Sequence, residues 1–201
     1  MTKIVPVRAF FVAALLLAAP CAFAAQSMGA DATDGQSELG VIELEAFHNA
    51  KVSLIQAIEA AERHAGGGRA VDASFEPQGS TGAYLIRVFR GHAVWEGLVD
   101  ARTGEVIGQG KTTPENELDP DDKAQVGVLD RVKTLLPDAI RAAEQQGNGK
   151  AINGSLEQRN GKLLYEIEIV TDSTVRAVTA DALTGRMEPP RPESGSSRPA
   201  R

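Results

Sequence analysis

Two short motifs place an aspartate shortly before a Thr-Gly pair, at Asp100–Gly104 (DARTG) and at Asp181–Gly185 (DALTG). One carboxylate from each half of a chain is the arrangement of an aspartic protease, in which two facing carboxyl groups share a proton. That chemistry needs aspartate, threonine and glycine to be contiguous, whereas two residues separate the aspartate from Thr-Gly in both motifs. The spacing therefore predicts no catalytic residues here.

The same spacing is typical of a structural turn. An aspartate at the first turn position can accept hydrogen bonds from the backbone N–H groups two and three residues later. A glycine at the end of the turn can adopt a positive φ angle and send the chain back. We therefore predict structural turns formed by Asp100, Thr103, Gly104, Asp181, Thr184 and Gly185.

The two motifs belong to an internal repeat. An offset of 81 residues aligns them and also aligns Tyr84–Val88 with Tyr165–Ile169. A shift by one residue then aligns Ala57–Glu62 with Ala139–Glu144. The sequence thus predicts a tandem duplication. We expect a signal peptide at 1–24, a flexible lead-in at 25–49, the first unit at 50–111, an acidic linker at 112–131, the second unit at 132–188 and a disordered tail at 189–201.

Each unit is expected to be one helix followed by three or four antiparallel strands. Ser53 and Gln56 have the spacing of a capping box at the start of the first helix, and Pro137 suits the first turn of the second, with Thr134 as its expected cap. Alternating residues then predict strands, the third of them over Ala93–Val99 in the first unit. A short final strand is expected at 105–107. The fold class is α+β, with the helix packed on one face of each sheet.

The ordered elements resemble the PepSY domain family. The segments "AKVSLIQAIEAAE", "GGRAVDASFE", "AYLIRV" and "VDARTGEV" carry the resemblance in the first unit, and "LLPDAIRAAE", "GKAINGSLE", "LYEIEI" and "TADALTGRM" carry it in the second. The resemblance implies a cystatin-like fold and a role in holding peptidases in check. No HExxH zinc-peptidase motif occurs in the chain, so any inhibition would act on a separate molecule.

The first residues predict export. Lys3 and Arg8 precede a short apolar run. Ala22-Phe23-Ala24 then offers small residues where a signal peptidase cuts, so we expect cleavage after Ala24. Pro20 precedes the only cysteine, Cys21, which argues against a lipoprotein. The apolar run is shorter than a spanning helix requires. We expect a periplasmic or secreted protein with no integral membrane segment in the mature chain.

Charge and metal-ligating residues exclude several classes of partner. The predicted signal peptide holds two basic residues and no acid, so the net charge of −6 becomes −8 after its removal, which argues against nucleic acid as a partner. The three histidines, His48, His64 and His92, lack zinc-ligand spacing. The acidic stretch 117–122 lacks the alternating ligands and central glycine of a calcium loop. We expect neither a metal nor another cofactor.

These observations favour a non-enzymatic exported bacterial protein that binds another protein, with an extracytoplasmic peptidase as the candidate partner. Trp95 and Arg176 occupy equivalent positions and are candidate protein contacts, because both residue types are enriched at interface hot spots. Burial of Trp95 in the first core is the competing interpretation. The alternative function is a structural or ligand-binding envelope module for cell-wall material or a small apolar ligand. An enzyme would require a pocket that gathers carboxylates from both units.

Overall fold

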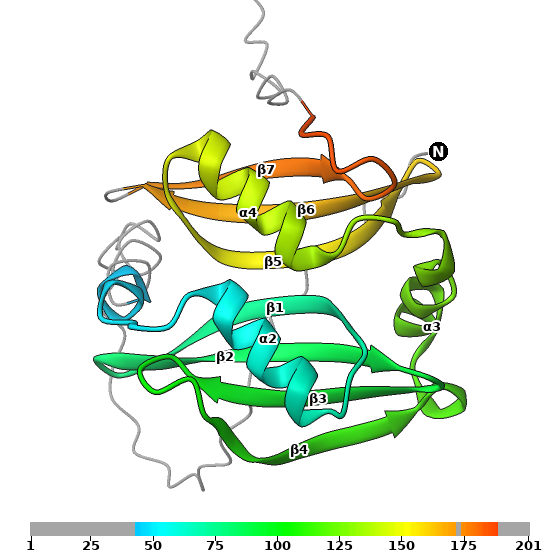
Figure 1. Cartoon of the computed structure of the whole chain (residues 1–201), viewed down its shortest axis with the longest axis horizontal. Coiled ribbons are helices and arrows are strands. Elements are labelled where there is room, and N and C mark those ends of the chain that lie inside the picture. Colours follow the sequence, from blue (N-terminus) through cyan, green and yellow to red (C-terminus); the bar gives the residue numbers. More distant parts are fainter. Residues whose placement is uncertain (1–42, 172–173, 189–201) are drawn as a thin grey trace, which may run out of the picture. The chain divides into compact units, whose positions relative to one another are not determined.

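The structure is a computed structural model that describes residues 43–171 and 174–188 (Figure 1). The predicted signal peptide 1–24, the lead-in up to residue 42 and the tail 189–201 lie outside these residues. The elements are α2 (Leu54–His64), β1 (Arg69–Gln78), β2 (Thr81–Arg90), β3 (Ala93–Asp100), β4 (Val106–Pro114), α3 (Pro120–Val126), α4 (Leu136–Gly147), β5 (Lys150–Arg159), β6 (Lys162–Thr171) and β7 (Thr174–Asp181). Short 3₁₀ turns cover 115–117 and 129–131.

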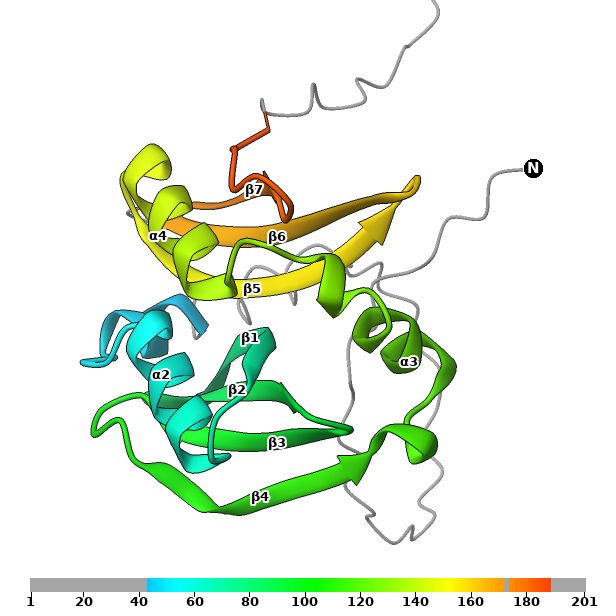
Figure 2. The same cartoon turned by 45° about the vertical axis from the view of Figure 1, so that its right-hand side comes forward.

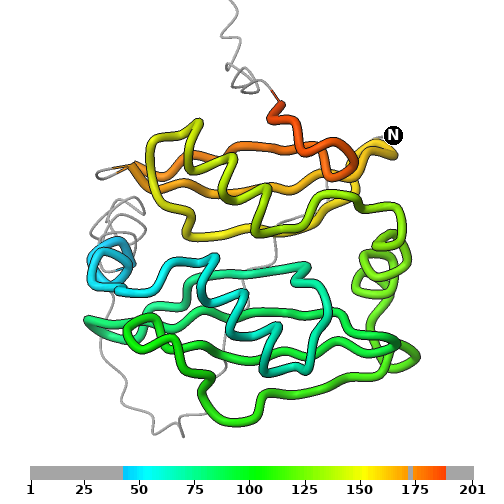
Figure 3. Tube along the Cα trace, in the orientation of Figure 1, coloured from blue at the N-terminus to red at the C-terminus, as the bar shows by residue number. Residues whose placement is uncertain are grey.

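All strands join one antiparallel sheet in the order β4-β3-β2-β1-β5-β6-β7. The first repeat contributes α2 and β1–β4, and the second contributes α4 and β5–β7. Both helices cover the same face of the sheet (Figure 2), and the two halves follow similar paths (Figure 3). The predicted α+β fold with two tandem helix-on-sheet units is therefore confirmed.

The core lies between that sheet face and the two helices. α2 buries Leu54, Ala57, Ile58 and Ala61, and α4 buries the equivalent Leu136, Ala139, Ile140 and Ala143. This spacing places the apolar residues along one side of each helix. The four central strands β1, β2, β5 and β6 alternate between buried and half-buried residues over most of their length, because successive side chains face the helices and the open side in turn.

The two helices begin differently. The predicted capping box is present in α2: the Ser53 hydroxyl accepts from the Gln56 N–H, and the Gln56 side chain accepts from the Ser53 N–H. The predicted Thr134 cap of α4 is wrong, because α4 begins after Leu135, which has no capping side chain. The Thr134 backbone is used elsewhere: its carbonyl accepts from the Tyr165 hydroxyl at 2.9 Å.

The repeats meet along a short seam between β1 and β5. Only three residue pairs, from Asp72–Ser155 to Ser74–Asn153, connect the two strands. Residues 43–48 are helical, and their Ala46 and Phe47 are buried in the common core. This part of the lead-in was expected to be flexible. Its apolar residues explain the difference, since Phe47 packs edge-on against Phe75 with ring centroids 5.3 Å apart.

The segment predicted as a linker also contains secondary structure. β4 extends to Pro114, well beyond the expected strand at 105–107, and α3 follows it. Asp122 of α3 forms an ion pair with Arg87 of the first repeat at 2.6 Å. Gln125 of the same helix donates to the Leu156 carbonyl of the second repeat at 2.7 Å. The segment therefore connects to both repeats through specific contacts.

No helix within residues 43–171 and 174–188 is long and apolar enough to cross a membrane.

Candidate functional site

The two Asp-Ala-x-Thr-Gly motifs form the same turn. Asp100 Oδ1 accepts from the N–H groups of Arg102 and Thr103, both at 2.8 Å. The second motif repeats this pattern: Asp181 Oδ1 accepts from the backbone N–H groups two and three residues later, at 2.9 and 2.8 Å. Gly104 and Gly185 have φ angles of 75° and 70°. Each carboxylate is thus used to order its own turn.

The alanine of each motif connects the turn to the start of the helix. Ala101 and Ala182 are fully buried. The Ala101 carbonyl accepts from the N–H groups of Lys51 and Val52 at 2.9 and 3.0 Å, and Ala182 does the same for two N–H groups of the second repeat, at 3.1 Å each. The motif therefore positions the segment that leads into the helix, which explains why a small apolar residue follows each aspartate.

The two motif carboxylates lie far apart. Asp100 ends β3 and Asp181 ends β7, and the sheet order places β2, β1, β5 and β6 between these strands. Five strand spacings correspond to about 24 Å along a flat sheet. Two carboxyl groups that share a proton must lie within a few ångströms of each other. The geometry contradicts an aspartic-protease dyad formed from these residues.

The hydrogen bonds shift both carboxyl pKa values downward. The N–H groups of Thr103 and Arg102 hold the pKa of Asp100 below its ordinary value. For Asp181, partial burial would raise the pKa, but hydrogen bonds from the Thr184 hydroxyl and N–H outweigh it. Groups with a lowered folded-state pKa stabilise the fold above their unfolded-state pKa and lose that contribution as the pH falls.

Replacing both aspartates by alanine (D100A/D181A) should lower the free energy of unfolding by about 1–2 kcal/mol at pH 7, because each side chain satisfies two backbone donors. The difference from wild type should shrink as the pH falls from 4 toward 2. Urea denaturation at several pH values measures both effects. The matched variant D100N/D181N keeps one acceptor oxygen at each site and should lose less; an unchanged or more stable alanine variant would contradict the turn assignment.

A glutamate near the C-terminal end of each helix has a structural role that the sequence alone did not indicate. β1 and β5 both contain a register shift near their start. There the free backbone N–H groups of Ala70 and Ala151 donate to the carboxylates of Glu62 and Glu144, at 2.8 and 3.0 Å. The glutamate occurs at the same position in both repeats, which indicated a shared role. Its occurrence alone did not identify the backbone N–H group that it binds. Burial is the main reason that the pKa of Glu62 is raised.

The two candidate contact residues differ in burial. Trp95 is only 6% exposed, and its indole N–H donates to the Gln109 carbonyl at 3.0 Å. It therefore lies in the core of the first repeat, the position that the competing interpretation expects. Arg176, at the equivalent position of β7, is exposed. Its guanidinium donates to the Gly147 carbonyl at 3.4 Å.

A charged cluster lies on the open sheet face beneath α3. Arg87 contacts Glu96 at 3.6 Å and Asp122 at 2.6 Å, and Asp72 lies opposite Arg87 on the neighbouring strand. Burial raises the pKa of Asp72 to about 6, although Arg87 acts in the other direction. A perturbed carboxyl can mark a functional site, but structural ion-pair networks produce the same effect. Its contacts to α3 favour the structural role.

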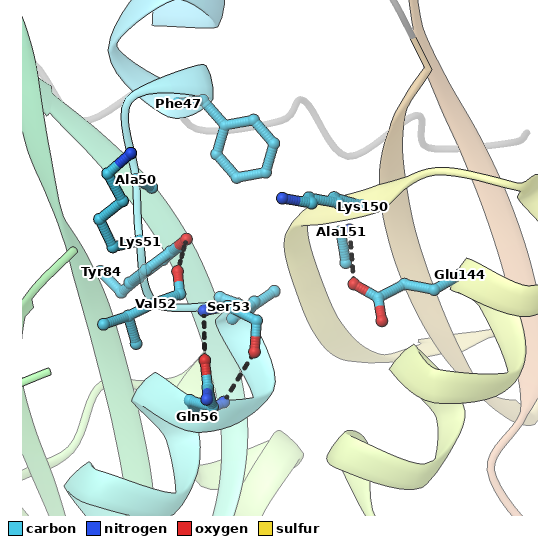
Figure 4. A pocket seen from close by; sticks show the side chains of 11 residues that line it. Phe47, Ala50, Lys51, Val52, Ser53, Gln56, Tyr84, Glu144, Lys150 and Ala151 are labelled. Carbon is cyan, nitrogen blue, oxygen red and sulfur yellow. Dashed lines mark hydrogen bonds between the residues drawn. The ribbon is translucent and has the colours of Figure 1, made fainter. Parts of the chain in front are cut away.

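A cavity of about 240 Å³ lies at the start of α2. Phe47, Lys51 and Ser53 line one side, and Glu144 and Lys150 of the second repeat line the other (Figure 4). Its polar groups are largely used within the fold. The Ser53 side chain caps α2, and the Glu144 carboxylate accepts from the backbone of β5. The cavity therefore offers few convergent groups for a ligand.

The histidines do not converge. His64 packs near the ring of Trp95 with centroids 5.5 Å apart, and His92 contacts Glu115 at 3.1 Å. Within the part of the chain that the structure describes, no group of three or more histidine, cysteine or acidic side chains could hold a metal ion.

Comparisons with known proteins follow the repeat boundaries. The sequence model of the family described as "Peptidase propeptide and YPEB domain" (PepSY) matches residues 51–109 and 138–187. A solved structure of a candidate lipoprotein from Clostridium difficile 630 is 21% identical, with 70% of this chain and 93% of that chain covered and a TM-score of 0.43. No curated protein matches the sequence.

Proposed function

The chain belongs to the PepSY family, and from this membership we propose that it is a non-catalytic, exported protein-binding module that regulates an extracytoplasmic peptidase. The observation that carries the proposal is the family match itself, which occurs twice and covers both helix-on-sheet repeats. In this proposal the regulated peptidase is a separate molecule.

The geometry of the motifs is compatible with a binding role. Asp100 and Asp181 are committed to their own turns and lie at separate places along the sheet. In the cavity beside α2, the Ser53 side chain caps the helix and the Glu144 carboxylate accepts from the strand bulge. An interface needs neither an activated nucleophile nor a paired acid and base, so these features are compatible with a binding role.

The alternative of an apolar ligand on the open sheet face has less support. That face of the second repeat carries Asn153, Glu157, Arg159, Glu166 and Glu168, all partly exposed. Arg159 contacts both Glu157 and Glu166, so these side chains form a polar network. An apolar ligand would have to displace water from these groups without replacing its hydrogen bonds.

Affinity capture tests the proposed function. The tagged mature chain, starting at Ala25, is incubated with periplasmic extract and culture medium of the source bacterium, and retained proteins are identified by mass spectrometry. We expect a peptidase retained in stoichiometric amounts and absent from a tag-only control. Retention of no protein above that control would contradict the proposal and direct attention to cell-wall binding.

A further inference from the structure

The outer edge of β7 forms one end of the sheet. In the first repeat, the equivalent edge of β3 is covered by β4, which pairs with it from Ala93 to Val99. In the second repeat, within residues 43–171 and 174–188, the only corresponding pairing is a single bridge between Ala180 and Met187. Among the described residues, the position that β4 fills beside β3 therefore holds only this bridge beside β7.

The backbone polar groups at this edge point outward. Glu188 N–H donates to the Thr179 carbonyl at 2.7 Å, so Thr179 turns its polar groups away from β6. The direction alternates along a strand, and Val175 and Ala177 therefore point their N–H and C=O groups outward as well. A chain placed antiparallel along β7 would find a donor and an acceptor at both residues.

The sequence that follows the bridge is unsuited to that position. In the register of the bridge, Pro190 would lie opposite Ala177 and Pro192 opposite Val175. These are the two positions at which an added strand donates its N–H groups to β7, and proline has no N–H group. In this register, the sequence that directly follows the bridge therefore lacks the two N–H groups that an added strand would donate to β7.

Charge also disfavours the residues after the bridge as a strand beside β7, and it indicates which residue would fit opposite Arg176. In the same register, Arg191 would lie directly opposite Arg176, and like charges at opposed positions destabilise a strand pair. Arg176 is exposed, and its guanidinium donates a long hydrogen bond to the Gly147 carbonyl. The pair at this position is of the closely spaced type, in which side chains interact strongly. An acidic residue on an added strand would complement Arg176.

We propose that the outer edge of β7 binds an extended segment of another protein as an eighth, antiparallel strand, with an acidic residue opposite Arg176 and β-branched residues opposite Val175 and Val178. Val175 is 46% exposed and Val178 is half-buried, so both can contact such residues. Strand addition gives affinity through the backbone and specificity through alternate side chains. This inference rests on the proposed protein-binding function and names the site where it occurs.

A designed peptide provides the probe. The peptide VTEVESG corresponds to residues 189–195 with Pro189→Val, Pro190→Thr, Arg191→Glu and Pro192→Val, and it omits residues 186–188 because the protein's own residues already pair with β7 there. It supplies the two missing N–H groups and the acidic residue opposite Arg176. The first control is the natural sequence PPRPESG, which should not bind. The second control keeps arginine at position 191 in place of the glutamate and should bind about fivefold more weakly.

Amide hydrogen exchange of the full mature chain locates the binding. At saturating peptide, we expect exchange at Val175 and Ala177 to slow by about tenfold or more, because both amides gain partners. Ala177→Pro removes only an outward-pointing N–H and should abolish the protection, as edge strands tolerate proline at such positions. Ala177→Val keeps the N–H and should behave like wild type.

A charge exchange keeps the test valid even if Ala177→Pro fails to fold. Arg176→Glu should weaken binding of the glutamate peptide and restore binding of the arginine peptide. Protection at β4 in place of β7, affinities that ignore the charge at residue 176, or protection that depends only on protein concentration would each overturn the inference, the last by identifying a second copy as the occupant.

The outcome is separable from the proposed function. Peptide binding at β7 with no peptidase retained would support the edge site and contradict the peptidase partner. A retained peptidase whose binding ignores both Ala177→Pro and Arg176→Glu would support the function and overturn the edge site.

Discussion

Replacing Trp95 by alanine should lower the free energy of unfolding by about 3–5 kcal/mol, the usual cost of truncating a large buried aromatic residue. The ring occupies space that two glycines leave open. A Cβ added at Gly97 would lie 2.4 Å from the ring, and one at Gly110 would lie 2.6 Å from it. The indole N–H also loses its bond to the Gln109 carbonyl. Urea denaturation followed by circular dichroism measures the change.

The equivalent residue of the second repeat supplies the matched control. Arg176→Ala removes an exposed side chain with one long hydrogen bond, so we expect a change of no more than about 0.5 kcal/mol. Equal losses for Trp95→Ala and Arg176→Ala would contradict the assignment of Trp95 to the core.

Replacing Asp72 by asparagine should stabilise the protein at neutral pH. Burial raises the pKa of Asp72 to about 6 in the folded state, whereas the unfolded value is about 4. The folded state therefore binds the proton more tightly, and wild-type stability falls as the pH rises from about 4 to 6. The shift corresponds to about 2–3 kcal/mol. Asparagine imitates the protonated acid and removes this penalty.

Denaturation at two pH values tests this prediction within one pair of proteins. Near pH 4, Asp72 is protonated, so D72N and wild type should differ little. At pH 8, D72N should be more stable by the amount given above. Arg87 keeps Asp122 and Glu96 as counter-charges in the variant. A variant that is less stable than wild type at pH 8 would show that the Asp72–Arg87 attraction outweighs the cost of burial.

The repeated parts of the fold could be predicted because local chemistry determines them. The spacing of Ser53 and Gln56 indicated a helix start, and the alternation from Tyr165 to Ile169 indicated a strand with one buried face. Duplication strengthened both predictions, since the same pattern occurred at a fixed offset. The two turns used residues whose conformational preferences are strong even in isolation.

The parts that join the repeats could not be predicted in this way. The seam between β1 and β5 depends on long-range register, to which neither strand's own pattern points. The burial of Phe47 depends on its contact with the distant Phe75, which the sequence around Phe47 does not indicate. α3 is short, and contacts to Arg87 and to the Leu156 carbonyl on different repeats position it.

The position of Trp95 illustrates a further limit. Residue type alone suggested either an interface or a core position, and both interpretations were consistent with the sequence. The core position is possible because Gly97 and Gly110, which lie on different strands, together leave room for the ring. The equivalent β4 segment is absent from the described part of the second repeat, and there the same position holds an exposed arginine.

Titration of peptidase activity shows whether the mature chain inhibits a peptidase. The purified mature chain is added in increasing amounts to a panel of secreted and envelope peptidases that includes metallo-, serine and cysteine enzymes, each assayed with a small fluorogenic substrate. The proposed function predicts that at least one enzyme loses activity with a sharp end point at a fixed molar ratio. Full activity of every enzyme at a large excess of the chain would contradict peptidase inhibition as its role.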